Sequence, residues 1–305
     1  MRTTVTFALF LLSSVGRISP TSGQSTVAVE TLSEPLEGGS GGISVGPDGR
    51  IYVADFGEML NGSGEPGTRV FVVEPDGSSR VFAEGLRGAS GNEMGEDGIL
   101  YQSNIGGSYI SKIHPDGTTE QWVSEGISSP VGIATASNGD LIVANCGNNT
   151  LRRVAPDGTS SEFLASDLLA CPNGITVDDD GNFYVANFAN GNVIRVTASA
   201  EASVLATLPG NNNGHLVFHR SALYVVARSA HQIYKVTVGG EMELVAGSGE
   251  QGLDDGVGAE ATFSYPNDIG VSPDGRYLYV NDVADLSSTG VLLAPMVVRR
   301  LHIGG

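Results

Sequence analysis

Short runs of alternating apolar and polar residues, separated by turn residues, recur along the chain. The clearest unit is PNGITVDDDGNFYVANFANGNVIRV, residues 172–196, in which two alternating runs are joined by an Asp-Gly turn and followed by a polar turn and a third run. Alternation with a period of two predicts β-strands, and such short turns predict antiparallel connections. The unit returns at residues 131–154 as VGIATASNGDLIVANCGNNTLRRV and near the start as GISVGPDGRIYVADFG. This recurrence predicts a repeat protein.

The second strand of each unit sets the period of the repeat. Its hallmark position is filled six times, by Tyr52, Tyr101, Ile142, Tyr184, Tyr224 and Tyr279. The steps between these positions are 49, 41, 42, 40 and 55 residues. Four strands in roughly 40 to 50 residues are typical of a β-propeller blade. A β-sandwich would explain strands and turns, but not their regular return. We therefore predict an all-β, six-bladed β-propeller with four antiparallel strands per blade.

The two ends of the chain predict export and ring closure. Arg2 precedes an apolar run at residues 5–15, and small or polar residues follow, which is the layout of a secretory signal peptide. We predict a signal peptide over residues 1–24 and a single propeller domain over residues 25–305 of a secreted or periplasmic protein. The sixth unit ends before a fourth strand, and STVAVETL at residues 25–32 is a strand without a unit. We expect this N-terminal strand to close the last blade.

Composition narrows the possible partners. The chain has 43 glycines and a formal net charge of −18. An acidic surface repels nucleic acid and anionic membranes, which bind Lys-rich and Arg-rich surfaces. No later segment is apolar for long enough to span a bilayer. We expect a monomer whose partner is a small-molecule ligand or substrate, with no nucleic acid and no membrane insertion.

The two cysteines lie in loops of neighbouring blades on one face of the predicted ring. Cys146 follows the second strand of blade three, and Cys171 precedes blade four. In an exported chain this favours a disulfide, with free buried thiols as the alternative.

The sixth unit carries a family resemblance. VAGSGEQGLDDGVGAEATFSYPNDIGVSPDGRYLYVND, followed by Arg299-Arg300-Leu301, resembles an NHL repeat. The chain after the signal peptide resembles the gluconolactonase/regucalcin-like superfamily of six-bladed propellers. This resemblance implies a metal-dependent hydrolase of lactones or ester-type small molecules, with its site at the top of the central channel. The same fold includes non-catalytic NHL-type propellers that bind ligands or proteins, and histidine-dependent lyases, and both remain alternatives.

The resemblance also implies a divalent cation, most often calcium, held in the channel by Glu, Asn and Asp side chains. Asn173, in the matching context N-G-I, takes the place of a family Asn ligand, and Asn213 takes the place of the family Asp. The family Glu falls on Gly41, and Asp268 is a carboxylate that could replace it. The alternative for Asn173 is an asparagine that caps a turn. No organic cofactor is expected.

Candidate acid–base and substrate-binding residues lie near the same strands. His215 stands where Ile133, Ile175 and Ile269 stand in other blades, and we interpret it as a general base, with Glu93 as a second catalytic group. A packed histidine and a solvated rim carboxylate are the structural alternatives. Asn267, Arg228 and His231 are the candidate substrate-binding residues, and the alternative for Arg228 is a surface cation. We expect Asn173, Asn213, His215 and Asn267 to cluster at one end of the channel.

Overall fold

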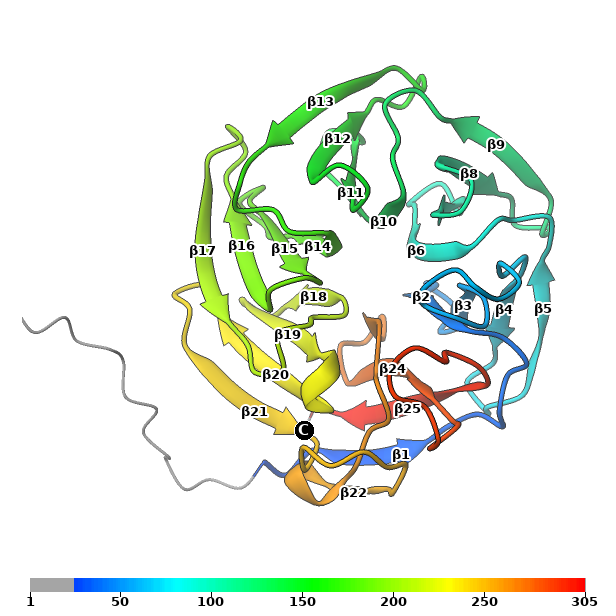
Figure 1. The fold of residues 1–305 in the computed structure, drawn as a ribbon, viewed down its shortest axis with the longest axis vertical. Helices are drawn as coiled ribbons and strands as arrows, with labels where there is room; N and C mark the ends of the chain where they lie inside the picture. Colours follow the sequence, from blue (N-terminus) through cyan, green and yellow to red (C-terminus); the bar gives the residue numbers. More distant parts are fainter. Residues whose placement is uncertain (1–24, 305) are drawn as a thin grey trace, which may run out of the picture.

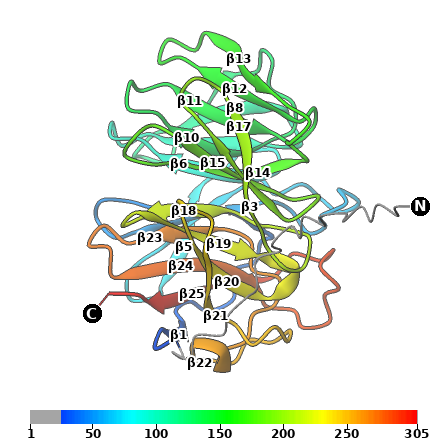
Figure 2. The same cartoon turned by 90° about the vertical axis from the view of Figure 1, so that its left-hand side faces the viewer.

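The computed structural model describes residues 25–304, so the predicted signal peptide at residues 1–24 lies outside the described residues. Six antiparallel β-sheets stand around a central axis like the blades of a propeller (Figure 1). The predicted six-bladed fold is therefore confirmed. Seen from the side, the strands lie in stacked sheets, with the C-terminus near β25 (Figure 2). Within the described part of the chain, no helix is long and apolar enough to cross a membrane.

Five blades are four-stranded sheets whose strands follow one another in sequence. Blade one contains β2 (Ser40–Val45), β3 (Ile51–Asp55), β4 (Val70–Val73) and β5 (Ser79–Ala83). Blade two contains β6 (Ala89–Met94), β7 (Leu100–Asn104), β8 (Tyr109–Ile113) and β9 (Thr119–Val123). Blade three contains β10 (Pro130–Thr135), β11 (Leu141–Asn145), β12 (Thr150–Val154) and β13 (Ser160–Ala165). Blades four and five are β14 (Pro172–Val177), β15 (Phe183–Asn187), β16 (Asn192–Val196) and β17 (Ala202–Thr207); and β18 (Leu216–His219), β19 (Ala222–Ala227), β20 (Gln232–Thr237) and β21 (Met242–Ala246), with the 3₁₀ helix η1 (Arg228–Ala230).

Blade six is closed by the N-terminal strand, as predicted. It contains β23 (Ile269–Val271), β24 (Tyr277–Val283), β25 (Met296–His302), β1 (Ala28–Thr31) and the two-residue β22 (Gly256–Val257), and η2 (Gly258–Glu260) follows β22. Strand β1 pairs antiparallel with β25 on one side and with β22 on the other. Because the last blade takes its outer strand from the start of the chain, the ring is held shut by main-chain hydrogen bonds.

The core lies between the blades. The buried hydrophobic side chains form six clusters, and each cluster combines residues of two neighbouring blades. Strand β3 shows how this works: Ile51 and Val53 pack towards blade six, whereas Tyr52 and Ala54 pack towards blade two. Both faces of each sheet are thus covered, which explains why the second strands are apolar along their whole length. The outer strands are largely exposed.

We call the face that carries the loops before each inner strand the upper face, and the face with the first hairpin turns the lower face. On the upper face, the last residue of the second strand holds the loop that precedes the inner strand. Asn104 accepts a hydrogen bond from the main-chain N–H of Arg87, at 2.8 Å, and Asn187 accepts one from Ala170 at 3.1 Å. Asp55, Asn145 and Asp282 do the same in their blades. These recurring polar residues are structural.

Candidate functional site

The inner strands of the six blades line the central channel in successive rings of residues. Val185 in blade four and Val225 in blade five are equivalent, because each follows the hallmark tyrosine of its second strand. Val185 pairs with Ile175 and Val225 pairs with Leu216, so Ile175 and Leu216 are equivalent too. His215 therefore stands one ring above the position of Ile175, and the predicted alignment of blade five was wrong by one residue. The cause is the first hairpin turn: five residues separate the paired Val177 and Phe183, but only four separate Phe218 and Leu223.

The ring that contains His215 is made of small residues in four blades. Its members are Gly42, Gly91, Gly132, Gly174, His215 and Asp268. A Cβ on Gly132 would stand 2.4 Å from the carbonyl oxygen of Asn173, and a Cβ on Gly174 would stand 2.4 Å from Cα of His215. Side chains at this level thus point at the inner strand of the next blade, where backbones approach closely. Blades five and six depart from this pattern, and their two side chains meet.

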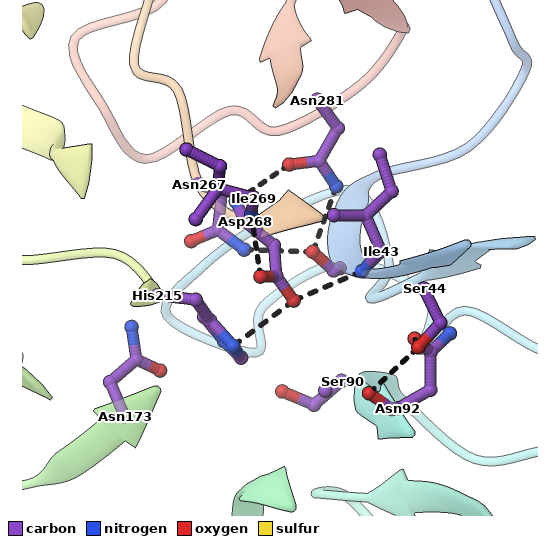
Figure 3. A network of polar contacts seen from close by, with 12 residues as sticks. Ile43, Ser44, Ser90, Asn92, Asn173, His215, Asn267, Asp268, Ile269 and Asn281 are labelled. Carbon is purple, nitrogen blue, oxygen red and sulfur yellow. Dashed lines mark hydrogen bonds and ion pairs between the residues drawn. The ribbon is translucent and has the colours of Figure 1, made fainter. Parts of the chain in front are cut away.

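His215 and Asp268 form a buried pair of polar side chains in close contact. Nδ1 of His215 lies 3.0 Å from Oδ2 of Asp268, and each side chain is under 10% exposed (Figure 3). Oδ2 also accepts the N–H of Ile43 in blade one at 3.0 Å, and Oδ1 accepts the N–H of Ile269 at 2.6 Å. The carboxyl group of Asp268 therefore bridges blades six and one, and it lies directly against the imidazole.

A second polar residue in blade six supports this pair and was missed in the sequence. Asn281 accepts the N–H of Asp268 at 2.8 Å and donates to the carbonyl oxygen of Gly41 at 2.8 Å (Figure 3). Asn281 occupies the strand position that holds alanine in Ala54, Ala144 and Ala186. Blade six thus has Asn281 where other blades have alanine and Asp268 where other blades have glycine. These two differences in one blade could have identified the polar site from the sequence.

Burial opposes charge on both members of the pair. It raises the pKa of Asp268 well above the usual carboxyl range, and the nearby Glu93 raises it further. Burial lowers the pKa of His215 to about 3. The imidazole is therefore neutral at pH 7, and the contact is not an ion pair. Among residues 25–304, Nε2 of His215 has no hydrogen-bond partner.

The pair lines a cavity of about 220 Å³ in the lower part of the channel, which we call the lower cavity. Its lining combines aliphatic side chains, such as Ile133, Ile175 and Leu216, with polar side chains that include Asn92 and Glu93. Burial raises the pKa of Glu93 to about 7. The lower cavity thus brings together a neutral histidine and a carboxyl group that is partly protonated at neutral pH, and this combination suits acid–base chemistry.

A second cavity of about 190 Å³ lies at the mouth of the channel, which we call the upper pocket. Its polar lining is Ser40, Ser90, Asn173 and Asn267, and its apolar lining is Phe56, Leu60, Ile105, Val131, Phe188 and Leu293 together with Cys146 and Cys171. These two cysteines form a disulfide, with their Cα atoms 4.0 Å apart. The expected cluster is therefore divided: Asn173 and Asn267 line the upper pocket, His215 lines the lower cavity, and Asn213 lines neither.

The residues named as metal ligands do not converge. Asn173 lines the upper pocket, while Asp268 lies in the lower cavity and uses both oxygens on protein N–H groups. Asn213 is fully buried and donates to the carbonyl oxygen of Asn192, away from both cavities. In residues 25–304, no group of three His, Cys, Asp or Glu side chains is placed to hold a cation. This donor set does not fit a divalent cation, and we route no step through one.

Arg228 and His231 lie outside both cavities. Arg228 is only 2% exposed, so the alternative of a surface cation was wrong. Its guanidinium donates to the carbonyl oxygen of Gly290 at 3.1 Å and lies over the ring of Tyr265. The ring of His231 packs edge-on against Tyr265, with centroids 4.6 Å apart. Burial lowers the pKa of Arg228 to about 10. These contacts tie Arg228 and His231 of blade five to the loop before β23, and Arg228 also to the loop between β24 and β25.

Comparisons with known proteins agree with this architecture. A family model described as NHL repeat matches residues 128–153 and 169–195. No curated protein sequence matches the chain. Solved structures share the fold at low identity, among them a gluconolactonase from Xanthomonas campestris, with 15% identity, a TM-score of 0.68, and coverage of 90% of this chain and 89% of that one.

Two further solved structures with the same fold differ in what they are described to do. One is a catalytically inactive variant of virginiamycin B lyase from Staphylococcus aureus with quinupristin, with 16% identity, a TM-score of 0.61, and coverage of 91% of this chain and 99% of that one. The other is an auxiliary nutrient binding protein from Bacteroides ovatus, with 14% identity, a TM-score of 0.68, and coverage of 91% and 77%. The chain thus contains NHL repeats and is a six-bladed propeller whose fold is shared with gluconolactonases, as the sequence predicted.

Proposed function

We propose that this protein is an exported enzyme that hydrolyses a small, uncharged lactone or ester in the lower cavity of its channel. The observation that carries the proposal is the His215–Asp268 pair, in which Nδ1 of the imidazole lies 3.0 Å from a carboxyl oxygen while Nε2 has no hydrogen-bond partner among the described residues. A neutral histidine beside a carboxyl group can serve as a general base. The carboxyl groups of Glu93 and Asp268 in the cavity and the acidic surface disfavour an anionic substrate.

The proposed reaction uses groups that line one cavity. With the proton of neutral His215 on Nδ1, which faces Asp268, Nε2 takes a proton from water while the water oxygen bonds to the carbonyl carbon. The carbon–oxygen bond to the leaving group then breaks, and protonated Glu93 gives that oxygen a proton. Transfer of the proton from His215 back to Glu93 through solvent restores both groups, so one water is consumed per bond broken.

The fold relatives and the disulfide support parts of this proposal. A gluconolactonase and a lyase have the same fold, so hydrolysis and elimination are both within its chemical range. The bonded Cys146 and Cys171 suit a secreted or periplasmic protein, because the cytosol keeps thiols reduced. A lyase is the second candidate, since a base that activates water can also remove a proton next to a carbonyl group.

The test is turnover of a panel of small neutral lactones and esters, followed by acid release. We expect His215→Gln to lower kcat by about 100-fold or more. His114→Gln, an exposed histidine, is the matched control and should act like the parent. Reaction in oxygen-18 water separates the candidates, because hydrolysis places solvent oxygen in the acid and elimination does not. If no member of the panel is turned over, or if His215→Gln is fully active, the proposed acid–base site is wrong.

A further inference from the structure

The upper pocket is separate from the proposed acid–base site. Its lining comes from the upper rings of the inner strands and from loops of the upper face, whereas the lower cavity begins at His215. None of the residues that line the upper pocket carries an ionisable side chain. A charged ligand would therefore lose its hydration without gaining a partner, which is a large cost. An uncharged ligand has no such cost.

Two amide groups give the upper pocket a polar end. Asn173 uses its Nδ2 to donate to the carbonyl oxygen of Asn213, at 3.1 Å, and Asn267 uses its Nδ2 to donate to that of Gly41, at 2.9 Å. Since a carbonyl oxygen can only accept, these contacts fix which atom of each amide is the nitrogen. Each Oδ1 is left without a hydrogen-bond partner in residues 25–304. Figure 3 shows both side chains at the channel beside His215. They present acceptors to a ligand.

A buried hydroxyl adds to this polar end. Ser40 is 2% exposed and lines the upper pocket, yet its Oγ has no hydrogen-bond partner. Buried polar atoms without partners are uncommon in folded proteins, and each one raises the question of a missing ligand or water. This hydroxyl lies buried behind the pocket wall, near the two amide oxygens that lack partners.

Apolar side chains from two long loops cover the opposite side. The loop after β3 and the loop after β24 are joined, because Leu60 donates its N–H to the carbonyl oxygen of Val291 at 2.8 Å and Leu293 donates to that of Glu58 at 2.8 Å. This joint places Leu60 and Leu293 in the wall of the upper pocket. The volume of about 190 Å³ slightly exceeds the roughly 150 Å³ cavity that holds benzene.

We propose that the upper pocket binds a small, uncharged molecule with one apolar ring or a short branched chain and a hydroxyl or N–H donor at one end. The donor bonds to the amide oxygens of Asn173 and Asn267, and the apolar part packs against Leu60 and Leu293. This site is independent of the acid–base pair below it, so it binds its ligand whether or not His215 is present.

Calorimetric titration with phenol tests the donor requirement, and anisole, which lacks the donor, is the matched probe. We expect phenol to bind at least about fivefold more tightly than anisole, because one hydrogen bond contributes about 1 kcal/mol. Benzoate should not bind measurably. Equal affinities for phenol and anisole, or no binding of either at millimolar concentration, would overturn the proposal.

Variants locate the binding. Leu293→Trp should fill the upper pocket and abolish phenol binding, whereas Leu286→Trp, which is 54% exposed in the same loop, should bind like the parent. If Leu293→Trp unfolds, Asn173→Ala serves instead and should reduce the preference for phenol over anisole. His215→Gln should retain binding. Loss of binding in His215→Gln, or its retention in a folded Leu293→Trp, would contradict the assignment. Turnover of a lactone or ester depends on His215, whereas phenol binding in the upper pocket does not. A negative result for one proposal therefore leaves the other intact.

Discussion

The imidazole of His215 crosses the channel and packs against Gly91 on the far side of the ring. A Cβ on Gly91 would stand 2.9 Å from Cε1 of His215 and 2.4 Å from the carbonyl oxygen of Val131. Glycine at residue 91 therefore makes room both for the catalytic candidate and for the next blade. This is why a histidine can occupy a ring that is otherwise too narrow for side chains.

Gly91→Ala should destabilise the protein by about 1–3 kcal/mol, because the methyl group overlaps backbone atoms that cannot move independently of their sheet. Gly239→Ala is the control, since its Cβ would meet nothing closer than 3.6 Å. Urea unfolding of both variants provides the measurement. Equal midpoints for the two variants would show that the glycine ring is not tightly packed.

The stability of the protein should depend on pH through Glu93. Its pKa is about 7 in the fold and 4.5 without the fold, so the folded state binds the proton more tightly. Stability from this group is then fully present below about pH 4.5 and is lost as the pH rises through about 7. Glu93→Gln removes this dependence and should gain about 1–2 kcal/mol relative to the parent between about pH 5 and pH 8. Thermal melts of both proteins at the two pH values provide the measurement. If the stability difference between Glu93→Gln and the parent is the same at both pH values, this carboxyl group is not buried as described.

Closure of the ring by β1 predicts a contrast between two neighbouring residues. Val29 is 3% exposed and packs in the core between blades five and six, whereas the side chain of Glu30 is 53% exposed and pairs with Arg300. We expect Val29→Ala to cost about 1–3 kcal/mol and Glu30→Ala less than about 1 kcal/mol. Deletion of residues 25–32 should lower Tm by more than either. If the deletion and the parent melt together, β1 does not close the ring in solution.

The disulfide joins residues 25 apart in sequence, and in the chain-entropy description it should stabilise the fold by about 3 kcal/mol. The double variant Cys146→Ser, Cys171→Ser is expected to unfold at correspondingly lower urea concentration. Thiol labelling of the denatured, unreduced parent should detect no free thiol in the chain. Two labelled thiols per chain would show that the bond is absent in the purified protein.

Calcium should leave the melting temperature within about 1 °C of the metal-free value at millimolar concentration. The reason is that Asn173 lines the upper pocket, Asp268 lines the lower cavity, and Asn213 lies away from both. Magnesium, manganese and zinc serve as parallel titrations, and Asn173→Ala should respond like the parent. A larger shift that disappears in Asn173→Ala would restore the metal site that the family resemblance implies.

The sequence by itself determined the blade number, the strand order and the closing strand. These follow from periodicity, since Tyr52, Tyr184 and Tyr279 mark second strands whose neighbours must all be apolar when both faces of a sheet are buried. The candidate residues were also recognisable one by one, because His215 and Asp268 interrupt positions that are otherwise apolar or glycine.

Only the tertiary structure decided which of these residues meet. One residue fewer in the turn of blade five moves His215 up by one ring and turns Asn213 away from the channel, and no local pattern specifies such a shift. The contact between His215 and Asp268 joins residues 53 apart in sequence, and it depends on how closely neighbouring blades approach. The spacing between neighbouring blades is set by packing across the whole ring, where glycine backbones touch. The same ring of close contacts lies between the upper pocket and the lower cavity.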